Sequence, residues 1–153
     1  MIDIDDIDRQ LVDGLLTDGR ASANELANSV GIATATATKR IRALEDAGVI
    51  EGYRADVDYA GFGYEVTAVF RLDVTGDGLS EVVADLRDTG HMIGVYEVTG
   101  SDDVVAIGKF EDTDALNAQI KEVLTHSRVE SVSTDVVLDT VCEHDPVALA
   151  AEE

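Results

Sequence analysis

The chain lacks the marks of secreted and membrane proteins. Its single cysteine, Cys142, permits no disulfide within the chain, which agrees with a reducing compartment. No segment approaches the roughly 18 uncharged apolar residues of a membrane-spanning helix. The opening MIDIDDID has no apolar stretch of the kind found in signal peptides. We therefore expect a cytoplasmic protein with no membrane partner, and the sequence indicates no cofactor.

Basic residues are scarce, because 11 Lys and Arg stand against 32 Asp and Glu and the net charge is −21. The acidic residues are spread through periodic segments, so they do not indicate disorder or an acidic tail. Such a surface holds hydrated cations and tolerates its own repulsion in strong salt, where charges are screened within about 3 Å at 1 M. This composition resembles that of cytosolic proteins from extremely halophilic archaea. With 45% apolar residues, the chain can form one ordinary domain or two small ones.

The region from Ser22 to Gly48 has the pattern of a helix-turn-helix. Ser22 and Glu25 have the spacing of a capping box, which starts a helix. Gly31 ends that helix, because glycine readily adopts the left-handed backbone of a sharp turn. The apolar residues of the two helices keep helical spacing on one side: Leu26, Ala27 and Val30 in the first, and Ala37, Ile41 and Leu44 in the second.

The other side of the second helix is polar, small and basic. Short hydroxyl side chains let a helix approach base edges, and Lys and Arg bind phosphates or guanine, so this side suits the major groove of DNA. Residues 20–44 hold four basic residues and one acid, a charge of +3 in a strongly acidic chain. An ordinary solvated helix face is the alternative. The candidate DNA-binding residues are Ser22, Thr34, Ala35, Thr36, Thr38, Lys39, Arg40, Arg42 and Arg54, with Arg40 anchoring either phosphate or the domain core.

Segments on both sides complete this domain. An apolar stripe within residues 4–16 predicts a scaffold helix with Asp5 as its N-cap. Residues 49–58 alternate in polarity, which predicts a short hairpin or wing and then a linking strand. Arg54 would reach the DNA backbone there or be a solvated strand residue. We expect a winged helix-turn-helix domain over residues 1–52, a linker strand over 53–63 and a second domain over 64–153.

The second domain repeats a unit of strand, helix and strand. The two copies lie 37 positions apart: 69–72, 79–86 and 91–98 in the first, and 106–109, 116–123 and 128–138 in the second. Two such units make a βαββαβ, ferredoxin-like domain of the RAM type, with both helices on one face of the sheet. The whole chain is thus expected to be α+β. A second copy would bury the uncovered apolar face of the sheet in a symmetric dimer.

A set of short motifs runs through nearly the whole chain. They are Gly31-Ile32, Arg40-Ile41 with Leu44-Glu45, Gly48-Val49-Ile50 with Gly52-Tyr53, Tyr96, Gly100 and Asp103 of a G-x-x-D turn, and residues 134–138. Each motif is weak alone, but together they are a strong signal. In this order they resemble the leucine-responsive regulatory protein family, Lrp/AsnC.

The resemblance implies a dimer or octamer that binds double-stranded promoter DNA and responds to an amino acid held between ligand-binding domains. The residues alone say less: a glycine turn exposes amides for a carboxylate, and a nearby Asp could bind an ammonium group. A plain β-turn is the equal alternative. The effector-binding residues implied by the resemblance are Tyr96, Gly100, Ser101, Asp102, Asp103 and Thr134.

Three positions depart from the family pattern. Ala33 stands where a Ser or Thr usually caps the second helix, so Thr34 is expected to cap it instead and to shift the reading residues by one. Ser127-Arg128 replaces the usual Pro-Gly before the last strand. Asp102 occupies a position where an aromatic residue is common, which leaves the identity of the effector open.

Two other functions compete with this interpretation. The architecture is also similar to that of sirohaem decarboxylases, but such an enzyme would need a pocket of His and Arg, and His91, His126 and His144 are scattered. A metal-sensing regulator could use Cys142 and His144. Two residues at this spacing cannot supply four tetrahedral ligands, so a solvated tail is favoured. We expect neither an enzyme nor a metal site.

We predict that folding depends on salt. The melting temperature should climb steeply between dilute and molar KCl, because screening weakens the repulsion among the carboxylates. Circular dichroism melts over a KCl series measure this dependence. A flat profile would contradict the halophilic interpretation of the surface.

Overall fold

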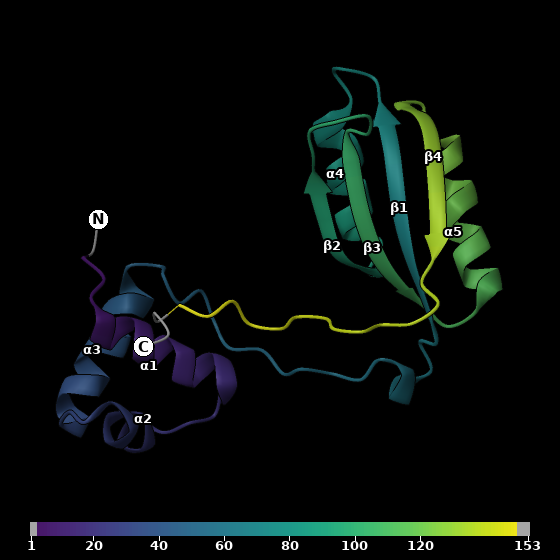
Figure 1. Ribbon diagram of the computed structural model, residues 1–153. Coiled ribbons are helices and arrows are strands. Elements are labelled where there is room, and N and C mark those ends of the chain that lie inside the picture. Colours follow the sequence, from purple (N-terminus) through teal and green to yellow (C-terminus); the bar gives the residue numbers. More distant parts are fainter. Residues whose placement is uncertain (1–2, 150–153) are drawn as a thin grey trace. The chain divides into compact units, whose positions relative to one another are not determined.

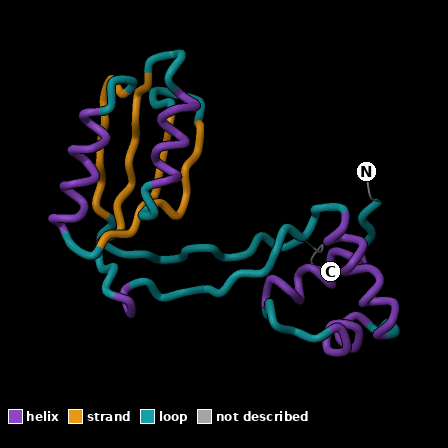
Figure 2. Tube along the Cα trace, turned by 180° about the vertical axis from the view of Figure 1, so that it is seen from behind, coloured by secondary structure: helices purple, strands orange, loops and turns teal. Residues whose placement is uncertain are grey.

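The computed structural model describes residues 3–149. The chain forms two compact units: the first runs to Asp56 and resumes at Cys142, and the second spans Val57–Val141. Figure 1 labels the elements of both units, and Figure 2 shows them from behind. This division differs from the expected domain of residues 64–153, because the segment from Cys142 belongs with the helix-turn-helix. No helix of the described residues is long and apolar enough to cross a membrane.

Three helices build the first unit: α1 (Asp6–Thr17), α2 (Ala23–Val30) and α3 (Thr34–Asp46). The helix starts predicted at Asp5 and Ser22 are confirmed. Each of these residues forms a capping box with the residue three positions on, in which side chain and backbone exchange hydrogen bonds. Gly31 follows α2 with a φ of 78°, in the left-handed region that glycine adopts without strain.

A small apolar core lies between the three helices. Its fully or almost fully buried members are Leu11, Leu26, Ala27 and Ala37. Ile7, Leu15, Val30 and Ile41 pack around them. The apolar stripes predicted from helical spacing therefore supply this core, and the predicted scaffold helix is confirmed as α1.

The Arg40 guanidinium holds α3 against the start of α1. Its Nη1 lies 2.8 Å from Asp5 Oδ2 and 2.9 Å from Asp8 Oδ1. Asp8 is only 5% exposed, and its carboxylate also accepts the Asp5 N–H. A buried carboxylate is costly unless it is paired and hydrogen-bonded. The cluster of Asp5, Asp8 and Arg40 thus satisfies a buried charge and joins two helices.

Residues 49–58 form no strand, so the predicted hairpin and linking strand are absent from this segment. Its polarity alternates, but no described strand pairs with it, and unpaired strands are not stable by themselves. Instead α3 ends in a turn at Gly48, which has a φ of 71°. The amides of Val49 and Ile50 then donate to the Leu44 carbonyl.

The second unit is an antiparallel sheet with two helices. In chain order its elements are β1 (Val66–Val74), α4 (Leu79–Asp88), β2 (Met92–Glu97), β3 (Val104–Phe110), α5 (Thr113–Thr125) and β4 (Val129–Val136), after a 3-10 turn at Ala60–Phe62. The strands lie in the order β2-β3-β1-β4. Both helices cover the same face of the sheet (Figure 1). This architecture confirms the predicted α+β class and the βαββαβ order.

The core of the second unit lies between the sheet and the helices. Alternate residues of β1 are buried there, and the ring of Phe70 lies 5.9 Å from that of Phe110 in β3. The helices contribute Val82, Leu86, Leu116 and Val123 to this core. The buried face of β1, formed by every second residue, thus packs against the apolar faces of α4 and α5, whose residues recur at helical spacing.

The opposite face of the sheet has no described helix over it (Figure 1). Val69 and Ile107 are paired across β1 and β3, and alternation directs their side chains to this open face. Tyr96 of β2 is 54% exposed at the same face. Arg71 of β1 and Asp135 of β4 form an ion pair beside them. The open face therefore has an apolar centre with a charged border.

We predict that the α1 capping box adds stability that acid removes. The Asp8 N–H and the Arg40 guanidinium lower the pKa of Asp5 below its ordinary value of 3.8. A carboxylate whose pKa is depressed by folding contributes stability above its unfolded pKa, and this is lost as the pH falls through the folded pKa. Asp5→Asn keeps a capping oxygen but removes the charge. It should melt below the wild type at neutral pH, with a difference that shrinks below about pH 4.

Circular dichroism melts in molar KCl across this pH range measure the difference. Asp3→Asn is the control, because Asp3 is exposed and lies outside the capping box. A difference between Asp5→Asn and the wild type that stays constant with pH would contradict the prediction.

Candidate functional site

The outer side of α3 carries most of the expected DNA-binding residues. Its exposed members are Thr34, Ala35, Thr36, Lys39 and Arg42. Ala37 and Leu44, on the opposite side of the helix, are almost completely buried. Thr38 is half-buried, and its hydroxyl donates to the Thr34 carbonyl at 2.9 Å. Packing of the apolar side therefore leaves a row of hydroxyl and basic side chains facing outward.

The expectation that Thr34 caps α3 is wrong. Ala33 is the N-cap, with extended backbone at φ −73° and ψ 142°, and it makes no side-chain hydrogen bond to the helix. Thr34 is already helical, whereas an N-cap residue has non-helical backbone angles. The first N–H groups of α3 thus lack a capping side chain, and such groups can bind a phosphate.

Two of the expected DNA-binding residues, Arg40 and Ser22, form side-chain hydrogen bonds within the first unit. Arg40 holds Asp5 and Asp8, whose hydrogen bonds raise its pKa. This engagement favours the second of its two expected roles, as an anchor of the domain core. The Ser22 hydroxyl lies 2.7 Å from Glu25 Oε2, and the Ser22 N–H lowers the pKa of Glu25. Both residues therefore shape the unit that presents α3.

Arg20 is a residue of this surface that sequence reasoning did not single out as a contact. It lines a cavity of about 270 Å³ together with Thr38, Arg42 and Tyr53. Burial, and the hydrogen bond that the Tyr53 hydroxyl donates to Glu45 at 2.8 Å, raise the pKa of Tyr53. The signal for Arg20 in the sequence was its place in the basic segment of residues 20–44.

Ion pairs separate the basic residues into two groups. The arginines of the second unit each hold a carboxylate: Arg71, Arg87 and Arg128. Five bases of the first unit hold no carboxylate of the described residues: Arg9, Arg20, Lys39, Arg42 and Arg54. Arg9 instead donates to the Leu149 carbonyl at 3.4 Å. The positive charge that can meet an external anion is therefore concentrated in the helix-turn-helix unit.

The expected effector turn joins β2 to β3. Gly100 has a φ of 130°, which favours glycine, and the Ser101 hydroxyl donates to the Asp102 carboxylate at 3.3 Å. Asp103 is built into the end of β1, because its carboxylate accepts the Val74 N–H at 2.8 Å. Its own N–H donates to the Leu72 carbonyl. One oxygen of the carboxylate expected to bind an ammonium group thus already has a structural partner.

The remaining effector candidates lie at the two edges of the sheet. Tyr96 is in β2 and Thr134 is in β4, and these are the outer strands of the order β2-β3-β1-β4. A side chain at Gly94 would collide with the Tyr96 ring, since its Cβ would lie 2.8 Å from that ring. One chain therefore holds Tyr96 and Thr134 at opposite edges of the sheet, while Asp103 of the turn contacts the central strand β1.

The histidines do not converge on a pocket for a tetrapyrrole. The His91 ring stacks on Phe110 at 5.1 Å, inside the second unit. His126 follows α5, and His144 lies in the segment that belongs to the first unit. Nothing in this arrangement supports the sirohaem decarboxylase interpretation.

Potential metal ligands gather at one place in the described chain. Glu81, Asp85 and His126 have ligand atoms within 4.8 Å of one another. Cys142 and His144 are not part of a group of three such ligands among residues 3–149.

Two family models match the chain. A winged helix-turn-helix DNA-binding model matches residues 4–51, and a model of the Lrp/AsnC ligand binding domain matches residues 67–147. The first match covers α1 to α3, and the second covers the sheet with its two helices. The two units of the structure thus correspond to two known kinds of domain.

Known proteins align with nearly the whole chain. An uncharacterized HTH-type transcriptional regulator of Pyrococcus furiosus is 36% identical over 142 residues, which cover 93% of this chain and 96% of that protein. The HTH-type transcriptional regulator FL11 of Pyrococcus horikoshii is 31% identical, with 91% and 92% covered. The structure of Escherichia coli AsnC is similar with a TM-score of 0.84 at 25% identity, covering 93% of this chain and 97% of that one. A Neisseria meningitidis regulator, solved as a complex with L-Met, shares the fold with a TM-score of 0.87 at 22% identity, covering 92% and 94%.

The first unit matches a DNA-binding domain and the second matches a ligand-binding domain. This combination defines a transcriptional regulator that binds DNA and carries a ligand-binding domain. The relatives that match over nearly all of the chain are named as transcriptional regulators. The chain belongs to the Lrp/AsnC family.

We predict that Asp103 supports the fold and that its neighbour Asp102 does not. Asp103→Ala leaves the Val74 N–H without its acceptor and should lower the free energy of unfolding by about 1–2 kcal/mol. Asp102→Ala should change it by less than about 0.5 kcal/mol, as is usual for surface positions. Chemical denaturation in molar KCl compares the two variants, and equal losses would refute the assignment.

Proposed function

We propose that this protein reads promoter DNA in a sequence-specific manner with α3 and responds to a small, amino-acid-like effector in the cytoplasm of a halophilic archaeon. The observation that carries the proposal is the exposed row of hydroxyl and basic side chains on α3. This row belongs to the first unit, in which Arg20, Lys39, Arg42 and Arg54 hold no carboxylate of the described residues. In a chain of net charge −21, this is where DNA phosphates meet the least repulsion.

The residues at the start of α3 enter the major groove. Thr34, Ala35 and Thr36 are small and exposed there, and the N-terminal part of a recognition helix contacts base edges. Lys39 and Arg42 follow along the helix and bind phosphates or guanine. Thr38 supports the helix from its half-buried position.

Flanking residues fix the register on the duplex. Ser22 at the start of α2 and Arg54 after α3 are exposed and contact the DNA backbone, a role that positions a protein without reading sequence. Arg20 adds charge beside Arg42, with which it shares a cavity. Arg40 holds α3 in place.

The open face of the sheet is the dimer interface. Its apolar centre at Val69 and Ile107 would be buried by the same face of a second copy, and a two-fold arrangement needs only one self-complementary surface. Arg71 and Asp135 border this centre and can pair with their counterparts. Further assembly into an octamer would bring the edges of neighbouring sheets together.

The effector site is completed by a second copy. Tyr96 lies in one edge strand of the sheet and Thr134 in the other, so a site using both needs two chains. The amides of the turn offer an anion site for the carboxylate of an amino acid. The complex of the Neisseria meningitidis regulator with L-Met supports an effector of this class.

Strong salt sets how the DNA is bound. The logarithm of the binding constant falls by roughly 0.9 per phosphate contact for each decade of salt, so phosphate contacts alone are weak in molar KCl. Base contacts and the joint action of two copies must supply more of the affinity. A two-fold dimer places its recognition helices about 34 Å apart, or a multiple of this, so we expect a pseudo-palindromic site.

Fluorescence anisotropy with the protein's own promoter fragment tests this proposal, beside a scrambled duplex, in about 2 M KCl to keep charges screened as in the cell. The wild type should prefer the promoter fragment. Thr36→Ala and Arg42→Ala should each weaken binding about tenfold, which is the usual scale of one lost base contact. Saturation at two chains per duplex would support the dimer.

Arg87→Ala is the matched control. It also removes one arginine, but Arg87 is in the second unit, where it holds Asp88 at 3.0 Å. This variant should bind as the wild type does. The proposal fails if the folded protein binds both duplexes equally, or if Arg87→Ala loses as much affinity as Arg42→Ala.

A further inference from the structure

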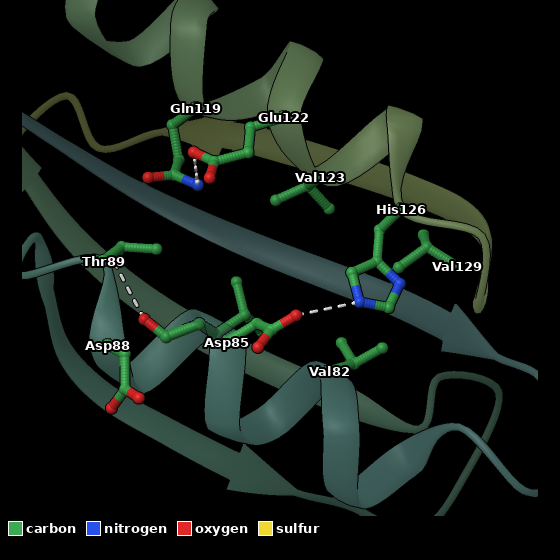
Figure 3. A pocket seen from close by; sticks show the side chains of 10 residues that line it. Val82, Asp85, Asp88, Thr89, Gln119, Glu122, Val123, His126 and Val129 are labelled. Atoms are coloured by element: carbon green, nitrogen blue, oxygen red, sulfur yellow. Dashed lines mark hydrogen bonds and ion pairs between the residues drawn. The ribbon is translucent and has the colours of Figure 1, made fainter.

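A cavity lies between α4 and α5, on the helix-covered side of the sheet. Its volume is about 290 Å³. Figure 3 shows side chains from both helices and from the start of β4 around it. This volume is just below the range for drug-sized ligands, which begins at about 300 Å³, so it suits a smaller molecule. The cavity uses none of the residues proposed to bind DNA or the effector.

The floor of this cavity is aliphatic. It consists of Val82, Leu86, Val123 and Val129. Val82, Leu86 and Val123 are also members of the buried core, with exposures of 2 to 5%. A branched alkyl group placed on this floor would remove its own surface and that of the floor from water, which is favourable.

The rim of the cavity is acidic. Asp85, Asp88 and Glu122 line it, and no Lys or Arg is among its lining residues. Gln119 is 5% exposed, and its amide donates to Glu122 at 3.3 Å (Figure 3). An aliphatic floor beneath several carboxylates favours a ligand that is apolar at one end and cationic at the other.

The hydrogen bonds of His126 favour an ammonium ligand over a metal ion at this rim. Its Nδ1 accepts the Arg128 N–H at 3.1 Å, so the neutral ring carries its proton on Nε2. Nε2 lies 3.1 Å from Asp85 Oδ2, to which it donates. A metal would need the lone pair of Nε2, and ligating histidines normally donate from the other nitrogen. Glu81 faces the Arg128 guanidinium at 3.6 Å, so it too is engaged.

We propose that this cavity binds a small primary amine with a branched alkyl group, such as the decarboxylated form of an aliphatic amino acid. The ammonium group lies at the rim that Asp85, Asp88 and Glu122 line, and the alkyl group lies on the floor of valines and leucine. An amino acid is disfavoured, because its carboxylate would enter a rim of three carboxylates, where the two neighbouring bases, His126 and Arg87, already hold Asp85 and Asp88. The site thus separates amines from the amino acids proposed for the effector turn.

Three probes that share one alkyl group test this site: 3-methylbutylamine, leucine and 3-methylbutan-1-ol. Methyl NMR of valine- and leucine-labelled protein in molar KCl locates binding, because Val82, Leu86 and Val123 report on the cavity itself. The amine should shift these methyl signals with a dissociation constant of about 1 mM, as expected for a ligand of so few atoms. Leucine should leave them unchanged whatever it does at the effector turn, and the alcohol should bind at least about tenfold more weakly.

Charge-removing variants test the rim. Glu122→Gln should weaken binding of the amine about threefold or more, and the double variant with Asp88→Asn should weaken it further. Glu130→Gln is the control, because Glu130 is an exposed acid of β4 that does not line the cavity. All of these side chains lie at the surface, so the variants should fold, which circular dichroism checks.

The proposal is overturned if the amine and the alcohol shift the cavity methyl groups at the same concentrations, since the carboxylates would then contribute nothing. It is also overturned if leucine shifts them as strongly as the amine, or if Glu122→Gln and Glu130→Gln lower the affinity equally. Selective binding of the amine that only the rim variants weaken establishes the site.

Discussion

Scarcity of positive charge is the constraint on which the rest of this structure depends. With 11 basic residues against 32 acidic ones, every guanidinium bound to a carboxylate inside the protein is one fewer for DNA. Arg40 is committed in this way, and it holds α3 to the capping box of α1. The arginines of the second unit are also paired with carboxylates. Stability and DNA binding therefore use different bases, and those left for DNA stand on and around one helix.

Local patterns predicted local structure, because the interactions behind them span only a few residues. Ser22 and Glu25 could be read as a capping box without knowledge of the rest of the chain, and Gly31 could be read as a helix end. The repeated strand, helix and strand likewise predicted the sheet and its helices. The length of β1 was not predicted. The sequence pattern indicated a strand at residues 69–72, whereas β1 extends from Val66 to Val74 because it pairs with both β3 and β4.

Long-range contacts could not be predicted in the same way. Arg40 meets Asp8 across 32 residues, and Asp103 binds the backbone of Val74 across 29, and no spacing rule implies either partner. Residues 49–58 alternate like a strand but have no strand beside them, because alternation reports polarity and not pairing. Resemblance to a family supplied the effector candidates. The strand order was needed to see that one chain holds Tyr96 and Thr134 at opposite edges.

The first unit is built from the two ends of the described chain, and this sets an order for its assembly during translation. Its buried core residues all come from the helices before position 45. The Leu149 N–H, however, donates to Asp13 at 2.9 Å across 136 residues. The three helices can therefore fold while the ribosome is still making the sheet, as N-terminal parts of a chain commonly do. The tail can join α1 only after β4 has been synthesised, so a nascent chain carries a folded DNA-binding unit before that unit is complete.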